Sequence, residues 1–185
     1  MEELGFICGR FQPFHNGHLK YAIEAKKRCK TLIIGLTQPD IENLSESNKK
    51  TERAEPSNNP LTYEERCKII TECLLHNEFS SNSFECRPFP LDTPELLKYF
   101  IPQTVTAYIN KLEKWNSDKE DILSKAGYTV EVLWEDYNPN KISGTDIRND
   151  ILDSGIYWKK DVDPSTIQII DNINLRERLL ELKSF

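Results

Sequence analysis

The chain has 185 residues, of which 38% are hydrophobic and 10% aromatic, enough for a packed core without disulfide or metal cross-links. Its 24 Lys and Arg against 30 Asp and Glu give a formal net charge of −6, which argues against a nucleic-acid-binding protein with a broad basic face. No apolar run approaches the roughly 20 residues that cross a bilayer, and the acidic start lacks a signal-peptide pattern. The five cysteines form no C-x-x-C pair, so we expect a cytoplasmic protein with reduced thiols and no membrane partner.

Five apolar, β-branched runs alternate along the chain with segments that favour helix. The expected strands are 4–8, 31–36, 84–89, 104–109 and 128–134. The expected helices are 17–30, Thr62 to Leu75 or His76, 94–100, 118–125, Ser143 or Thr145 to Leu152, and 166–182 with a break near 172–174. Thr62 and Glu65 form a capping-box pattern, and Gly127 is expected to end a helix. The alternation predicts the α/β class: a Rossmann-like, doubly wound parallel sheet of five or six strands with flanking helices.

No repeat or linker divides the sequence, so we expect a single domain over residues 1–185 with a helical tail at 166–185. Residues 37–58 are polar, rich in Ser and Asn, and without a period. A loop of this length in a compact domain is usually either functional or mobile. Its Lys49, Lys50 and Arg53 could close over a bound phosphate, but we favour a solvated surface loop.

The turn between the first strand and the first helix, residues 9–18, reads Gly-Arg-Phe-Gln-Pro-Phe-His-Asn-Gly-His. Ligands of doubly wound sheets bind at the carboxyl ends of the strands, where this turn is expected to lie. Its two glycines let the main chain approach a ligand, and the start of the next helix offers N–H groups to an anion. His15 and His18 can donate hydrogen bonds to phosphate oxygens, and Arg10 adds a fixed charge. We interpret the turn as a phosphate-binding cradle.

Competing interpretations of this turn are weaker. The sequence contains neither the G-x-x-x-x-G-K-[ST] pattern of P-loops nor the G-x-G-x-x-G pattern of dinucleotide-binding folds. His-x-x-His could form half of a zinc site, but only Cys8 lies nearby and zinc takes three or four ligands. Core filling does not suit a turn crowded with polar residues and glycine. We therefore expect no metal bound by protein ligands.

The cradle resembles the H-x-G-H signature of the nucleotidyltransferase superfamily, with flanks similar to those of archaeal-type nicotinamide-nucleotide adenylyltransferases. The second motif of the superfamily, I-S-x-T-x-x-R, is matched by residues 142–148 at the start of a late helix. The segment 59–66 and the tail 169–174 resemble that family as well. The resemblance covers nearly the whole chain apart from 37–58 and the stretch near 110–120.

The resemblance implies an enzyme in which an acceptor phosphate attacks the α-phosphorus of ATP in line and pyrophosphate leaves, without a covalent enzyme intermediate. The acceptor it implies is nicotinamide mononucleotide, and the product is NAD. The implied cofactor is Mg²⁺, carried by the ATP phosphates. The resemblance assigns catalysis to His15, His18 and Arg148. It assigns nucleotide binding to Gly9, Arg10, Phe11, Gln12, Asn16, Gly17, Ser143, Gly144 and Thr145.

The acceptor is expected near the polar residues that follow the fourth strand. The candidates are Tyr108, Asn110, Trp115 and Asn116, because a pyridine ring suits an aromatic stack and its amide suits hydrogen bonds. For Trp115, packing on the helix at 118–125 is an equal alternative.

Two departures from the archaeal-type pattern keep other functions open. The segment 108–116 differs from the family's usual sequence, and Asn58 stands where many relatives carry a basic residue. The alternatives are a different acceptor, such as nicotinate mononucleotide or another phosphate or phosphonate, with ATP or CTP as donor. A non-catalytic nucleotide-binding module is a further alternative. The sequence leaves the oligomeric state open, a homo-oligomer included.

Overall fold

The computed structural model describes residues 1–40, 55–111, 116–135 and 141–184, and the described chain separates into two compact units. The sheet unit consists of Met1–Gly9, Lys20–Pro39 and Ser80–Lys141. The helical unit consists of Arg10–Leu19, Asp40–Phe79 and Ile142–Phe185. A single domain over the whole chain stays a prediction. Lys49, Lys50 and Arg53 of the long polar segment lie outside the described residues.

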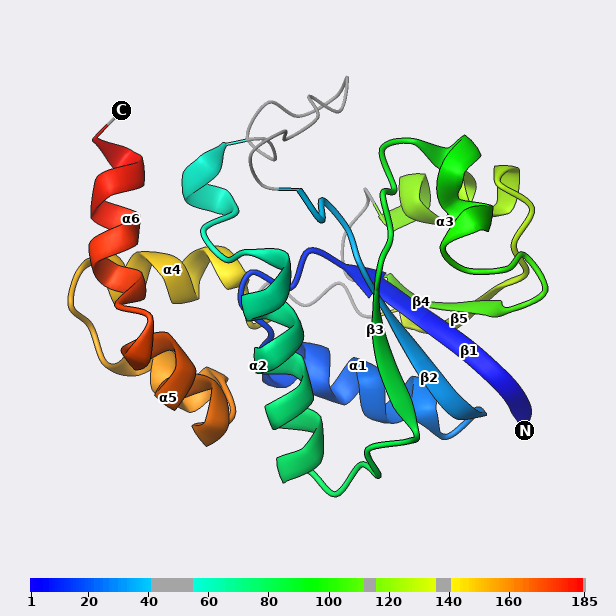
Figure 1. The fold of residues 1–185 in the computed structure, drawn as a ribbon, viewed down its shortest axis with the longest axis horizontal. Coiled ribbons are helices and arrows are strands. Elements are labelled where there is room, and N and C mark those ends of the chain that lie inside the picture. The colour runs from blue at the N-terminus through cyan, green and yellow to red at the C-terminus, as the bar shows by residue number, and fades with distance from the viewer. Residues whose placement is uncertain (41–54, 112–115, 136–140, 185) are drawn as a thin grey trace. The chain divides into compact units, whose positions relative to one another are not determined.

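One parallel sheet holds all five strands of the described chain in the order β3-β2-β1-β4-β5 (Figure 1). The strands are β1 (Glu2–Gly9), β2 (Cys29–Leu36), β3 (Phe84–Pro88), β4 (Thr106–Lys111) and β5 (Val130–Glu135). Each overlaps a predicted strand, so the predicted Rossmann-like α/β class is confirmed. The direction in which successive strands are added to the sheet reverses at β1, which pairs with both β2 and β4. The switch point, where such sheets bind ligands, therefore lies at the carboxyl ends of β1 and β4.

An aromatic cluster forms the core of the sheet unit. The Phe6 ring of β1 lies 5.2 Å from the rings of both Phe89 and Tyr128, centroid to centroid. Leu97 of the 3₁₀ helix η3 (Pro94–Tyr99) and Leu123 of α3 (Asn116–Lys125) join this cluster. Gly127 follows α3 with a φ of 90°, which confirms the predicted helix-ending glycine.

The remaining helix of the sheet unit is the larger part of α1 (Asn16–Lys26), whose first turn belongs to the helical unit. It buries Tyr21, Ala22 and Ala25, and the Tyr21 hydroxyl donates to the carbonyl of Tyr108 on β4. These buried side chains hold α1 and β4 together.

The helical unit contains α2 (Tyr63–His76), α4 (Gly144–Leu152), α5 (Pro164–Asn172) and α6 (Leu175–Lys183), with 3₁₀ helices η2 (Pro56–Asn58) and η4 (Tyr157–Asp161). In this unit α2 contacts α5, and α4 contacts α6 (Figure 1). The predicted break in the last helix is confirmed, because Asn174 adopts a left-handed conformation between α5 and α6. Within the described residues, no helix combines the length and apolar composition needed to cross a membrane.

The start of α2 is fixed by the predicted capping box. The Thr62 hydroxyl accepts from the Glu65 amide at 3.2 Å, and the Thr62 amide donates to the Glu65 carboxylate at 2.9 Å. Arg178 of α6 then donates to both oxygens of that carboxylate, at 2.6 and 2.8 Å. Because these contacts fix the first turn of α2, the side chain of the next residue, Arg66, projects from the helix in a defined direction.

We expect the Thr62→Ala variant to lose about 1 kcal/mol of unfolding free energy, because the Glu65 amide loses the Thr62 hydroxyl as its hydrogen-bond acceptor. Thr71→Ala, the same chemical change in the interior of α2, is the matched control and should be neutral or slightly stabilising. Urea unfolding of both variants measures the difference. Equal stabilities for the two variants would contradict a structural role for the cap.

Candidate functional site

The turn that the sequence marks as a phosphate cradle lies in the helical unit and holds its two imidazoles against each other. The rings of His15 and His18 stack with centroids 3.6 Å apart and planes 21° apart. The edge of His18 also packs against Phe11, with ring centroids at 4.9 Å. The His15 carbonyl accepts the amides of His18 and Leu19, which starts the helix directly behind the rings. The two imidazoles are therefore held in one orientation before any ligand arrives.

His15 is the more buried of the pair, with 7% of its surface exposed. Burial lowers the pKa of His15 to about 3, so the ring is neutral at pH 7. Its Nδ1 is buried and, within the described part of the chain, makes no hydrogen bond. A Cβ on Gly17 would lie 3.1 Å from that ring, so any other residue at this place would require the imidazole to move by a few tenths of an ångström. A buried polar atom without a partner marks a place where a ligand can supply one.

The second motif supplies a guanidinium to the same turn. Ser143 caps α4, its hydroxyl accepting the Thr145 amide at 3.2 Å. Arg148, one turn further along, is 5% exposed and donates from Nη1 to the Gln12 carbonyl at 2.6 Å. Its Nη2 donates to Asn58 Oδ1 at 2.6 Å and to Thr145 Oγ1 at 3.2 Å. The two motifs predicted to act together therefore meet within one compact unit.

A third segment, the start of α2, holds the turn from another direction. The Gln12 side chain pairs with the main chain of Leu61 in both directions, at 2.9 and 3.0 Å. Arg66 is fully buried and donates to the carbonyl of Arg10 at 2.9 Å and to that of Thr62 at 3.2 Å. The backbone of the turn is thus fixed at Arg10 and Gln12 by side chains and main chain from far along the sequence.

These contacts gather positive charge. Burial, with the charge of Arg10 as a smaller cause, lowers the pKa of both Arg66 and Arg148 to about 10. Both guanidiniums stay protonated at neutral pH, so like charges are held close together by the fold. Such a group of cations creates a local field that favours an anion of several charges.

The approach of α4 to the turn depends on Gly144. A Cβ there would lie 2.9 Å from the Gln12 carbonyl oxygen and 3.3 Å from Arg148 Nη1. The carbonyl is main chain and cannot swing aside, so a side chain at this position would separate the two motifs. Residue 144 is the first variable position of the I-S-x-T-x-x-R pattern, and in this protein the close contact with Gln12 favours glycine there.

The other residues predicted to bind the nucleotide lie in or beside the turn. Phe11 is buried, and the Asn16 amide donates to the Lys160 carbonyl at 3.1 Å. Gly9 ends β1 in the sheet unit, where its carbonyl accepts the Thr37 amide. Direct contact of any of these residues with a nucleotide stays a prediction.

The four acceptor candidates are distributed differently from the expectation. Tyr108 is 1% exposed and its hydroxyl donates to Glu2 at 3.4 Å, so its ring packs inside the sheet unit rather than at an open edge. Asn110 is half-buried near the carboxyl end of β4. Asn116 begins α3, and Trp115 lies outside the described residues. A role of Asn110, Trp115 or Asn116 in binding the acceptor stays a prediction.

Sequence reasoning assigned no role to Arg66. The signal was available, because Arg66 precedes Ile69 and Ile70 by three and four residues and so falls on the buried face of the helix. An arginine on a buried face needs hydrogen-bond acceptors, and here they are main-chain carbonyls of the cradle. Asn58, noted only as a departure from the family, is the acceptor for Arg148.

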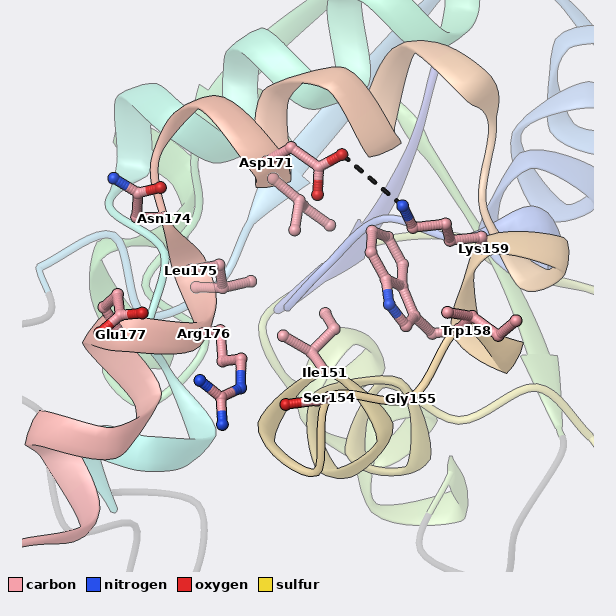
Figure 2. Close-up of a pocket in the computed structure, with 12 residues that line it drawn as sticks. Ile151, Ser154, Gly155, Trp158, Lys159, Asp171, Asn174, Leu175, Arg176 and Glu177 are labelled. Atoms are coloured by element: carbon pink, nitrogen blue, oxygen red, sulfur yellow. Dashed lines mark ion pairs between the residues drawn. The ribbon is translucent and has the colours of Figure 1, made fainter.

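No group of three or more His, Cys, Asp or Glu side chains among the described residues is arranged to hold a metal ion. The helical unit also has a cavity of about 250 Å³ lined by α4, η4, α5 and α6 (Figure 2). Trp158 and Leu175 lie on its wall, and Lys159 and Asp171 pair near it at 3.7 Å. None of the predicted site residues lines this cavity.

Comparison with known proteins agrees with the motif pair. The sequence profile of the cytidylyltransferase-like family matches residues 6–150, a range that contains both motifs. The chain belongs to this family. Its relatives are named as nucleotidyltransferases, and the protein is an enzyme of that kind.

Two curated relatives of this cytidylyltransferase-like protein match it over almost their full lengths. It is 31% identical to a phosphonoformate cytidylyltransferase of Streptomyces viridochromogenes, over 95% of this chain and 94% of the relative. It is 29% identical to a nicotinamide-nucleotide adenylyltransferase of Picrophilus torridus, over 96% of this chain and 95% of the relative.

A solved structure shows the same fold. It is a bifunctional NMN adenylyltransferase/ADP ribose pyrophosphatase from Francisella tularensis, complexed with AMP and a manganese ion. The two structures align with a TM-score of 0.63 and 16% identity over 98% of this chain. The cytidylyltransferase-like chain spans about half of the Francisella protein, 52% of its length.

We expect Gly144→Ala to lower the unfolding free energy, although alanine at an exposed first helical position is normally favoured over glycine by up to about 1 kcal/mol. The new Cβ would collide with the Gln12 carbonyl. A loss of unfolding free energy, in place of the usual gain, would therefore show that this contact is present. Urea unfolding measures it. A stabilised variant would show that the two motifs tolerate a wider separation.

The burial of neutral His15 predicts a pH dependence of stability. Its folded pKa, about 3, lies below the ordinary value near 6.5, so the unfolded chain binds the proton first as pH falls. The contribution is fully present above about pH 6.5 and is lost progressively towards pH 3. Between pH 7.5 and 5 the wild type should lose about 2 kcal/mol more than His15→Asn in urea unfolding. Parallel losses in both proteins would contradict a neutral buried ring.

Proposed function

We propose that this nucleotidyltransferase joins the nucleoside monophosphate of a nucleoside triphosphate to a phosphate-bearing acceptor by direct in-line displacement. An acceptor oxygen forms a bond to the α-phosphorus while the bond to the bridging oxygen breaks, and pyrophosphate leaves with that electron pair. The supporting observation is the hydrogen bond from Arg148 to the Gln12 carbonyl, which joins the two motifs in one cationic site. Catalysis then consists of positioning and neutralisation of charge.

The side chains have separate roles in this proposal. His18 and His15 donate hydrogen bonds to oxygens of the triphosphate, and the buried Nδ1 of His15 gains the partner that it lacks. An anion beside the stacked rings raises the tendency of one of them to take up a proton. Arg148 and Arg10 supply fixed charge for the leaving pyrophosphate. The hydroxyls of Ser143 and Thr145 cap α4 and orient Arg148, and they add hydrogen bonds to the same phosphates.

A divalent cation suits this site as a companion of the substrate. We propose that Mg²⁺ arrives on the triphosphate, since Mg²⁺ keeps most of its waters and needs few protein ligands. When bound, it would neutralise phosphate charge. The manganese ion and AMP in the Francisella structure are compatible with this arrangement.

The first candidate for the substrate pair is ATP with nicotinamide mononucleotide, which yields NAD. It is supported by the cradle and its flanks, and by the 29% identity with the Picrophilus torridus adenylyltransferase across almost the whole of both chains. Asn110 would contact the acceptor from the carboxyl end of β4.

The second candidate is CTP with a phosphonate acceptor. It is supported by the 31% identity with the Streptomyces cytidylyltransferase, named for phosphonoformate. The segment 108–116 departs from the adenylyltransferase pattern, as a different acceptor would require. Because the two sequence identities are nearly equal, an enzyme assay must decide between the two substrate pairs.

The assay combines ATP or CTP with nicotinamide mononucleotide, nicotinate mononucleotide or phosphonoformate. We expect the enzyme to release pyrophosphate far faster from one donor–acceptor combination than from the others. Mg²⁺ is present throughout, and EDTA should abolish the reaction. NAD from ATP and nicotinamide mononucleotide establishes the first candidate, whereas a cytidylyl product establishes the second. No turnover with any pair, together with tight nucleotide binding, would favour a non-catalytic module.

We expect His18→Ala to lower kcat by about 10²–10³-fold, the cost of one transition-state donor, while the variant stays folded. His76→Ala is the matched control, because His76 is the third histidine of the chain and is partly exposed at the end of α2, where it pairs with Asp163. Steady-state rates with the best substrate pair measure the effect. Wild-type turnover by His18→Ala would remove the imidazole from the mechanism.

A further inference from the structure

The switch point of the sheet carries a lysine that the two motifs do not account for. Lys119 lies on α3 and is half-buried. Its ammonium donates to the carbonyl of Cys8 at 2.6 Å. Cys8 is the second-last residue of β1, so the charge stands at the carboxyl end of the strand that pairs with both β2 and β4. Sheets of this kind bind their ligands beyond those strand ends.

Among the described residues, no carboxylate forms an ion pair with the ammonium of Lys119. Its partners there are the carbonyl and the thiol of Cys8, and it lies 5.7 Å from the centre of the Tyr21 ring. Because an ammonium has three N–H donors, the two Cys8 acceptors leave one donor for a further group. A half-buried cation in this state favours an anion as that group.

Two other lysines of the sheet unit have different surroundings. Lys111, at the end of β4, pairs with Glu120 at 2.9 Å and with Glu135 at 3.1 Å. Lys20 lies over the Trp134 ring at 5.6 Å and is exposed to solvent. Glu120 and Glu135 are thus engaged with Lys111, whereas Lys119 is half-buried without such a partner among the described residues.

The acceptor in the proposed reaction brings such a group. Nicotinamide mononucleotide carries a phosphate, and phosphonoformate carries a phosphonate and a carboxylate. The four residues that the sequence suggests for binding the acceptor are uncharged. None of them can balance the negative charge of the acceptor's phosphate or phosphonate. Asn110, near the end of β4, can add an amide hydrogen bond beside it.

We infer that Lys119 is the cation that holds the tetrahedral oxyanion of the acceptor, phosphate or phosphonate, at the carboxyl end of β1. The inference rests on the proposed nucleotidyl transfer and names a residue that determines acceptor affinity. The carbonyl and the thiol of Cys8 orient the ammonium, and its remaining N–H donor binds an oxygen of the acceptor.

The test compares Lys119→Met with Lys125→Met, which removes the same charge from an exposed position on the same helix. With the substrate pair that turns over fastest, Lys119→Met should raise the KM for the acceptor by about tenfold to a hundredfold, the range expected for a charge-assisted hydrogen bond. The KM for the triphosphate and its calorimetric Kd, measured without acceptor, should stay unchanged. Lys119→Arg should recover part of the acceptor affinity, and Lys125→Met should match the wild type.

The outcomes separate this inference from the proposed function. An acceptor KM that is unchanged in Lys119→Met, in an enzyme that turns over, overturns the inference and leaves the reaction standing. A weaker Kd for the triphosphate alone would also overturn it, because the lysine would then serve the donor. If the wild type transfers no nucleotide to any acceptor, the proposed function fails, and calorimetry of nicotinamide mononucleotide and of phosphonoformate tests the anion site by itself. Equal binding of both anions to the wild type and to Lys119→Met would then overturn the inference.

Discussion

The site depends on one buried hydrogen bond, from the Arg148 guanidinium to the Gln12 carbonyl. The two residues are 136 positions apart in sequence, and each belongs to one of the two motifs. A charged donor bound to a buried acceptor contributes about 1.5–3 kcal/mol, and losing one partner costs the desolvation of the other. The same bond therefore stabilises the helical unit and sets the position of the charge that we propose for the leaving pyrophosphate. This double role explains why Gly144, which leaves room for the approach, is as constrained as the arginine.

The site gathers cationic side chains. Burial disfavours the charged forms of Arg66 and Arg148, and the charge of Arg10 adds to that cost. Main-chain carbonyls and the Asn58 amide oxygen accept hydrogen bonds from these two guanidiniums and offset part of it. In the proposed reaction the triphosphate would offset more, because a polyanion attracts each cation near it. The neutral His15 adds a hydrogen-bonding group without adding to the repulsion.

Local patterns in the sequence predicted local structure well. The capping box at Thr62, the left-handed glycine after α3 and all five strands follow from residues that are close together in the chain. The two motifs predicted which distant segments act together, and Arg148 does bond to the Gln12 carbonyl, while their catalytic role stays a prediction. The Arg66 contact was missed, since the acceptor for a buried arginine is a carbonyl, and carbonyls have no sequence signature.

Tyr108 shows why an acceptor site is harder to predict. It lies in the fourth predicted strand, and its aromatic ring suggested a stacking partner for a pyridine ring of the acceptor. In the structure its ring fills the space beside Gly5, where a Cβ would come within 2.3 Å of Tyr108 Cε2. That space exists only because β1 pairs with β4, which sets Gly5 opposite Thr106. Such a pairing joins residues about a hundred positions apart and cannot be deduced from either segment alone.

The order of the elements along the chain has a consequence for how the protein is made. During synthesis β1 emerges first, but its β4 neighbour follows only after about a hundred more residues, so long-range closure slows the completion of the sheet. Arg148 is translated later still, after β5. The ribosome thus releases all five strands of the described chain before Arg148. Until then the turn between β1 and α1 lacks the guanidinium that binds the Gln12 carbonyl, so this turn cannot reach its final packing before the strands have been made.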